Sequence, residues 1–159
     1  MSATATAKLL NKVISGKDGK LFVTIDDGDP VLLYEAENFT ATLNYTNADI
    51  QALGSILIGA VTTGVSVAIS LNEFVVRDDV TVVPVINALN KNKVVKYTFQ
   101  GCLNRSDIDG QESRQTFRNC IPDGSHTLMG LTPGEVVKRE CSYRGNALPE
   151  IIKYFEEVA

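Results

Sequence analysis

The chain has 159 residues, a formal net charge of −4 and a pI near 5.0. Its 15 basic residues are scattered along the sequence, which argues against the basic groove of a nucleic-acid-binding protein. The three cysteines are an odd number, and no cationic and apolar leader precedes them, so we expect free thiols in a reducing compartment.

The chain most simply forms one domain, which at this length buries roughly 70% of the surface of the unfolded chain. Residues 1–7 are almost all Ala, Ser and Thr, with too little apolar surface to order themselves alone. We therefore expect a flexible N-terminal arm over residues 1–19 and a single domain over residues 20–159.

Two strands and a turn are predicted first. Residues 20–25 are rich in β-branched and aromatic side chains, and residues 26–30 consist of turn-forming Asp, Gly and Pro. The return strand begins at Val31 and runs toward Tyr45. Near its end the apolar Phe39, Ala41, Leu43 and Tyr45 alternate with the polar Thr40, Thr42 and Asn44.

Residues 50–72 form an uncharged run of 23 residues, long enough to span a bilayer as a helix. Glycines and hydroxyl residues interrupt the run, and from Leu57 onward its apolar side chains have the two-residue period of a strand. The pattern predicts one apolar face, with Leu57, Val61, Val65, Val67, Ile69 and Leu71, and one small neutral face, with Ala60, Thr62, Gly64, Ser66, Ala68, Ser70 and Asn72.

One helix is expected after this ribbon, with Arg77, Asp78 and Asp79 as its cap, an apolar face over residues 82–89, and Pro84 in its first turn. Further strands are expected at residues 93–103, 115–121, 126–131 and 135–143, and an acidic amphipathic segment at residues 148–158. The predicted class is mainly β, with two packed antiparallel sheets forming a sandwich or barrel, one flanking helix and a long hairpin.

Catalytic chemistry is not indicated. His126 is the single histidine, and the sequence has no nucleophile-turn motif, so no enzyme is expected. A zinc site built from Cys102, Cys120, His126 and Cys141 would lack the paired ligand spacing of such sites. Three buried strand thiols are the better interpretation, and no metal or cofactor is expected.

The two-faced ribbon has a consequence for assembly. A long ribbon presents unpaired N–H and C=O groups, and closure into a ring of subunits removes such edges. On this argument alone, a half-exposed strand in a monomeric β-sandwich binding module is an equally good alternative. A membrane pore would need aromatic girdles beside the ribbon, and residues 50–72 contain no aromatic side chain.

The order of elements resembles the tail tube proteins of contractile phage tails, including those of defective prophages and phage-tail-like bacteriocins. The segment Ile14–Phe22 (ISGKDGKLF) is similar to the start of these proteins. The early hairpin, the Gly- and Thr-rich ribbon at residues 53–72, the single helix after it and three closing strands also resemble the family. The likeness covers residues 13–155, and the fold is shared with the tube protein of type VI secretion.

This resemblance implies a structural protein whose six copies form a ring, with long hairpins joined in one β-barrel around a channel and rings stacked into a tube. It implies core-facing positions at Leu57, Val61, Val65, Val67, Ile69 and Leu71, and channel-facing positions at Thr40, Thr42, Asn44, Thr62, Ser66, Ser70 and Asn72. Contacts between stacked rings are expected at Lys17, Asp18, Lys20, Arg105, Asp107 and Asp109.

The implied partners are further copies of the chain, a sheath protein, baseplate and tail-terminator proteins, and a tape measure protein inside the tube, with no membrane. The implied location is the bacterial cytoplasm during assembly, and then a virion or a released tail-like particle. Tubes that carry DNA are often acidic inside in this family, whereas both predicted channel-facing strands are uncharged. That difference argues against the passage of DNA and leaves two alternatives, a bacteriocin-like particle or a channel in which other loops supply the acidic side chains.

Overall fold

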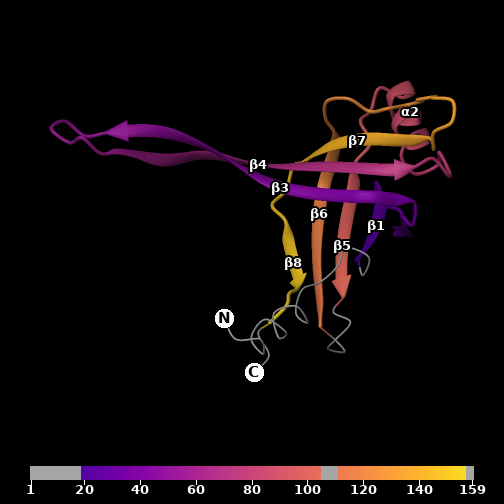
Figure 1. Ribbon diagram of the computed structural model, residues 1–159, viewed down its shortest axis with the longest axis horizontal. Helices are drawn as coiled ribbons and strands as arrows, with labels where there is room; N and C mark the ends of the chain where they lie inside the picture. Colours follow the sequence, from indigo (N-terminus) through magenta and orange to yellow (C-terminus); the bar gives the residue numbers. More distant parts are fainter. Residues whose placement is uncertain (1–18, 105–110, 157–159) are drawn as a thin grey trace.

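The computed structural model describes residues 19–104 and 111–156 and consists of a folded body from which one long hairpin projects (Figure 1). The expected N-terminal arm lies outside the described residues, except for Gly19. The described elements are β1 (Gly19–Ile25), β2 (Val31–Leu32), β3 (Ala36–Gln51), β4 (Ile58–Phe74), α2 (Val83–Asn90), β5 (Tyr97–Asn104), β6 (Glu112–Pro122), β7 (Lys138–Gly145) and β8 (Glu150–Lys153). The predicted class, mainly β with one helix, is confirmed for the described residues.

The strands form one eight-stranded sheet in the order β2-β1-β5-β6-β7-β4-β3, and β8 pairs with β6 off that path. Every pairing is antiparallel. The ring of Phe39 on β3 lies 5.8 Å from that of Phe99 on β5 and 6.0 Å from that of Phe117 on β6. Strands distant in the sheet order therefore face each other, so the two expected layers are halves of one sheet folded over on itself, which does not close.

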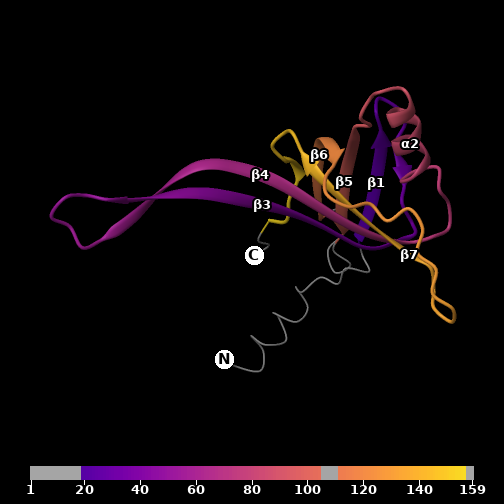
Figure 2. The same cartoon turned by 90° about the horizontal axis from the view of Figure 1, so that it is seen from above.

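The core lies between these two halves. Its largest fully buried side chains include Tyr97, Phe99, Tyr143 and Leu71, and the Tyr143 ring lies 4.9 Å from that of Phe99. The three cysteines are free and buried, which confirms the expected strand thiols. Helix α2 lies at the end of the body opposite the projecting hairpin (Figures 1 and 2) and packs Val85 and Ala88 against the core.

The predicted return strand is interrupted near its start. The two-residue β2 continues the β1 hairpin, and β3 then begins at Ala36 and extends to Gln51, beyond the expected region of Tyr45. Leu33 and Glu35 between the strands are buried, with 3% and 4% exposure. The chain turns at residues 34–35, and the buried Glu35 carboxylate accepts a 2.7 Å hydrogen bond from Arg77.

Three other expectations need correction. Residues 126–131 form no strand and lie in the connection from β6 to β7, where Thr127 N–H donates to the Glu140 carbonyl. The acidic segment near the C-terminus contains the short strand β8. Pro84 does lie in the first turn of α2, but no side chain caps that helix. The carboxylate of Asp78 instead accepts a 2.6 Å hydrogen bond from Arg139.

Candidate assembly surface

The outer part of the β3–β4 hairpin projects beyond the body as a two-stranded ribbon. Strand β4 pairs with β7 only over Val67–Phe74. In the described part of the chain, residues 44–66, here called the arm, therefore have no strand neighbour other than each other. Figures 1 and 2 show the arm extending far from the body in both views. Because an isolated two-stranded hairpin is marginal in water, the arm needs contacts that residues 19–104 and 111–156 of one chain do not supply.

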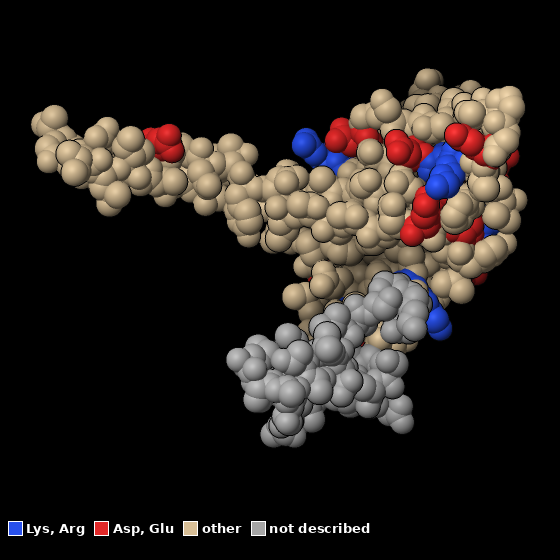
Figure 3. Space-filling view, in the orientation of Figure 1, with Lys and Arg blue, Asp and Glu red and all other residues tan. Residues whose placement is uncertain are grey.

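The surface of the arm is nearly free of charge. Between residues 38 and 72 the only charged side chain is Asp49, visible as the lone red group on the projecting ribbon (Figure 3). At the tip, Leu53 is 106% exposed, Ile56 98% and Leu57 76%. A contiguous exposed apolar surface of this kind marks a protein interaction site.

The two faces of the hairpin differ where it crosses the body. Val67, Ile69 and Leu71 are buried, and the side on which they lie is here called the core face. The other three residues expected on that face, Leu57, Val61 and Val65, are 76%, 49% and 46% exposed. The body therefore covers only the inner half of the predicted apolar stripe.

The opposite side of β3 and β4, here called the open face, brings together six of the predicted channel-facing residues. Thr40 pairs with Ser70, Asn44 with Ser66, and Asn38 with Asn72, while Thr42 pairs with Ala68. Directly opposed residues of an antiparallel pair share one face of the sheet, so these side chains form one neutral polar surface.

Strand β7 extends the open face with residues that the sequence did not point to. Ser70 pairs with Ser142, Asn72 with Glu140, and Ala68 with Arg144. On β7 the open face thus carries Glu140, Arg144 and, opposite Phe74, Lys138, all of them exposed. The alternation of residues 138–145 indicated a strand there. It did not indicate the partner of that strand, because β7 pairs with β4 about 70 residues earlier in the chain, and local periodicity carries no information on such pairing.

A β-bulge in the arm moves Thr62 away from the other predicted channel-facing residues. Thr46 pairs with Gly64 and Asn47 with Thr62, so Thr63 is an extra residue in β4. Asn47 lies on the core face because β3 alternates regularly from Leu43 and Tyr45. Thr62 therefore lies on the core face as well, and its hydroxyl donates a 2.9 Å hydrogen bond to Asn47 Oδ1. The grouping of Thr62 with Ser66 was wrong because an extra residue inverts the side-chain parity of a strand.

The same bulge moves Val61. It pairs with Ala48, which lies on the open face, so Val61 does not share a face with Val65, Val67 and the other apolar residues of its stripe. Leu57 lies in the connection between β3 and β4, outside the paired residues. The sequence offered little sign of the bulge in β4, because Val61, Val65, Val67, Ile69 and Leu71 all have odd numbers on both sides of Thr63.

Buried ion pairs fix the base of the hairpin to the body. Arg139 donates to Glu73 Oε1 at 3.0 Å, to Thr81 Oγ1 at 3.0 Å and to Asp78 Oδ1 at 2.6 Å. The side chains of Arg139 and Glu73 are only 4% and 1% exposed, and burial raises the pKa of Glu73 above its usual value. This network joins β4, β7 and the segment before α2.

The expected ring-to-ring contact residues are mostly outside the described part of the chain: Lys17, Asp18, Arg105, Asp107 and Asp109. Lys20 is exposed on β1 and pairs with Cys102. Gly19 pairs with Leu103, and Asn104 with Glu112. The points at which both undescribed segments join the body are therefore adjacent.

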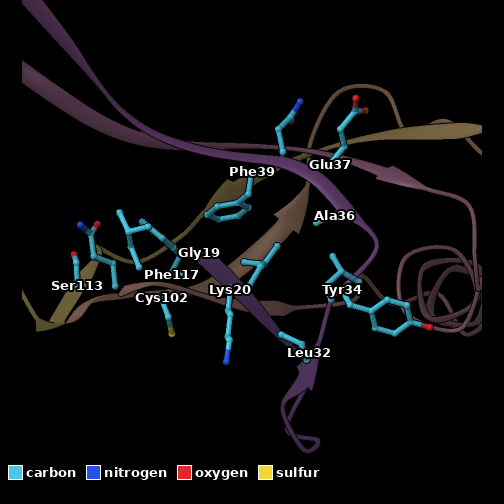
Figure 4. A pocket seen from close by; sticks show the side chains of 16 residues that line it. Gly19, Lys20, Leu32, Tyr34, Ala36, Glu37, Phe39, Cys102, Ser113 and Phe117 are labelled. Carbon is cyan, nitrogen blue, oxygen red and sulfur yellow. The ribbon is translucent and has the colours of Figure 1, made fainter. Parts of the chain in front are cut away.

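A groove of about 720 Å³ lies beside these residues, between the start of β3 and the strands β1, β5 and β6. In Figure 4 Phe39 points from β3 toward the opposite wall, which includes Gly19 and Phe117, while the Lys20 amine points away. The walls come from opposite ends of the sheet order, so the groove marks where the folded sheet stays open.

The family model described as "Phage tail tube protein" matches residues 7–145. The chain belongs to the phage tail tube protein family. Family membership makes this tail tube protein a structural component of a tube. No curated protein sequence matches the chain.

Solved tube structures have the same fold at low sequence identity. The tail tube chain resembles one from the extended sheath-tube complex of the extracellular contractile injection system PVC, with 14% identity, a TM-score of 0.61, and coverage of 96% of this chain and 99% of that one. The SPP1 tail tube protein has 13% sequence identity and a TM-score of 0.62, and the match covers 92% of this chain and 81% of that one. A chain from the tail of an empty gene transfer agent particle, refined with C6 symmetry, has 12% sequence identity and a TM-score of 0.61. That match covers 87% of this chain and 98% of the other.

The tail tube hairpin also settles the nature of the long uncharged run. Residues 50–72 contain the end of β3, the turn and most of β4, which confirms strands in place of a helix. Among residues 19–104 and 111–156, none of the helices has the length and apolarity needed to cross a bilayer.

Proposed function

We propose that this chain forms the inner tube of a contractile tail by stacking homohexameric rings around a central channel. The arm is the observation that supports this most directly. Residues 44–66 leave the body with both long edges unpaired and with exposed apolar side chains on an almost uncharged surface. Copies arranged in a closed ring satisfy such edges, whereas an open arrangement leaves an edge free to aggregate.

The open face is the part of the hairpin that we assign to the channel wall. Thr40, Thr42, Asn44, Ser66, Ser70 and Asn72 carry short neutral side chains, which offer a passing cargo little adhesion or obstruction. Glu140 and Arg144 on β7 add opposite charges to this face, and Lys138 forms an ion pair with Glu37, so the net charge stays near neutral. The core face packs toward the outer half of the folded sheet, in accord with the burial of Val67, Ile69 and Leu71.

Stacking of rings is assigned to residues 1–19 and 104–114. The described ends of these segments support this, because Gly19 pairs with Leu103 and Asn104 pairs with Glu112 at one end of the body. A single end of the body can thus present both segments to the next ring. Within them, the contact residues that we propose are Lys17, Asp18, Lys20, Arg105, Asp107 and Asp109.

The partners follow from the same proposal: a sheath protein around the tube, baseplate and terminator proteins at its ends, and a tape measure protein within it. Assembly would take place in the bacterial cytoplasm, and the tube would then form part of a virion or a released tail-like particle. DNA passes through the channel only if the particle carries a capsid, which an image of the assembled particle would reveal.

Purified chain, alone and with its tail proteins, should be examined by light scattering after size exclusion and by negative-stain microscopy. Rings with six subunits and stacked tubes are expected. A chain that stays monomeric at high concentration with its tail proteins present would contradict the proposal. That outcome would favour a monomeric β-sandwich binding module, for which the groove beside Phe39 is the candidate ligand site.

A further inference from the structure

The apolar side chains of β3 change faces within the arm. Up to Tyr45 the core face is apolar and the open face carries polar residues such as Asn44 and Thr46. Beyond Thr46 the order reverses, although β3 continues its regular alternation. The core face now carries Asn47, Asp49 and Gln51, and the open face carries Ala48 and Ile50.

Strand β4 makes part of the same change, and a bulge produces it. Val61 and Val65 both have odd numbers, so the sequence of β4 alone shows no reversal. The extra residue at Thr63 places Val61 opposite Ala48 on the open face, while Val65 stays opposite Tyr45 on the core face. The reversal is complete in β3 and partial in β4, where Ile58 and Ala60 lie on the core face with Thr62.

Charge decides which face of the outer arm, residues 47–62, can be buried. Asp49 lies on the core face opposite Ala60 and forms no ion pair with another described residue. Burying an unpaired carboxylate is costly, so this face stays in water. Ile50 and Val61 on the open face are 53% and 49% exposed, and their burial has no such cost.

Twist gives a physical reason for the change of face. Figures 1 and 2 show β3 and β4 winding around each other along the arm. Two-stranded ribbons twist strongly, and a bulge increases the local twist. In a twisted ribbon, an apolar face that stayed on one side would rotate away from an adjacent subunit along the length of the ribbon. A change of face keeps the apolar side chains directed toward that subunit.

We propose that the outer arm docks on a second copy of this chain through its open face, while the inner arm, residues 44–46 and 64–66, docks through its core face. The inference rests on the proposed tube function and specifies the contact that the arm makes there. A second copy fits because it presents an equally uncharged ribbon with unpaired edges, which can pair with the free edge of β3 while the apolar faces are covered.

Ile50 and Ile58 provide a matched test. Both are isoleucines of the outer arm, with 53% and 59% exposure, but Ile50 lies on the open face and Ile58 lies opposite Gln51 on the core face. Ile50→Asp should lower the fraction of chain in rings and tubes by at least about tenfold, and Ile58→Asp by less than about twofold. Val65→Asp and Ser66→Asp are the corresponding pair in the inner arm. Only Val65→Asp is expected to lower the fraction of chain in rings and tubes.

Thiol labelling provides a second measurement that does not depend on a disruptive charge. In assembled wild-type-like tubes, Ile50→Cys should be protected from a maleimide relative to free subunits, and Ile58→Cys should remain reactive. The natural cysteines are buried and give a low background.

The outcomes separate the two proposals. A wild-type chain that remains monomeric contradicts the tube function and this inference with it. Wild-type tubes together with intact assembly of Ile50→Asp, or with equal loss for Ile50→Asp and Ile58→Asp, contradict the inference alone. Equal labelling of the two cysteine variants in tubes also overturns it.

Discussion

Asn47 and Thr62 face each other across the arm, and the Thr62 hydroxyl donates a 2.9 Å hydrogen bond to Asn47 Oδ1. The pairing of these two residues shows which side chains of β3 and β4 share a face beyond the bulge. It places two polar side chains on the continuation of the face that carries Val67 and Ile69 in the body. The inner and outer parts of one hairpin are therefore built to contact different surroundings.

Loss of Arg139 should destabilise the body strongly. Arg139→Met leaves the buried Glu73 carboxylate without its cationic partner, which is expected to lower the free energy of unfolding by about 3–5 kcal/mol. Arg118→Met is the control, since its partner Glu150 is 47% exposed, and it should cost less than about 1 kcal/mol. Urea denaturation of both variants measures the difference, and equal effects would argue against the buried network.

Gly145 is a position where an added methyl group would be tightly packed. A Cβ there would lie 3.2 Å from both Cβ and Cγ1 of Val67 on the paired strand. Gly145→Ala should therefore lower the free energy of unfolding by about 1–3 kcal/mol. Gly64→Ala meets no heavy atom within 4 Å and should leave stability unchanged or slightly higher. Thermal unfolding of both variants checks this, and a stable Gly145→Ala chain would contradict the close β4–β7 contact.

His126 should make stability fall as the pH is lowered. Burial lowers the pKa of His126, whose ring packs edge-on against Tyr143 at 4.9 Å between centroids. Below about pH 6.5 the unfolded chain binds a proton at this histidine while the folded chain does not, so the unfolded state is favoured.

Replacement of this histidine provides the measurement. His126→Phe keeps the ring contact and should flatten the dependence of unfolding free energy on pH between about pH 7 and pH 5. Glu73, whose pKa is raised by burial, acts in the opposite direction, but its contribution is common to both proteins and cancels in the comparison. An unchanged slope in the variant would show that His126 is not buried as a neutral group.

The three cysteines should be unreactive in the folded chain. Burial raises the pKa of Cys120 to about 12 and that of Cys141 to about 11, and it also raises the pKa of Cys102. Because the thiolate is the reactive form, a thiol reagent near pH 8 should label none of them until denaturant is added. Val61→Cys, at an exposed arm position, should add one fast-reacting thiol, as counted by mass spectrometry. Fast labelling of the unmodified native chain would contradict the buried placement.

Local sequence patterns predicted many of the strands, the first hairpin and the start of the helix. Alternating residues in β1, β3 and β4 predicted strands, the turn chemistry at residues 26–30 predicted the first hairpin, and Pro84 marked the first turn of α2. These features were predictable because each depends on neighbours within a few residues. Residues 126–131 form no strand although Thr127 N–H donates to Glu140 of β7, whereas the β8 segment is a strand because it pairs with β6.

The sequence by itself determined that the arm is long, β-structured and almost uncharged, since these properties reside in its side chains and their period. Only the tertiary structure decided which face each side chain occupies. The pairing of β7 with β4 adds Glu140 and Arg144 to the open face, and Arg139 finds Glu73 across 66 positions of sequence. The single extra residue at Thr63 inverts the outer part of β4, because side-chain parity depends on the register with the partner strand and not on residue number alone.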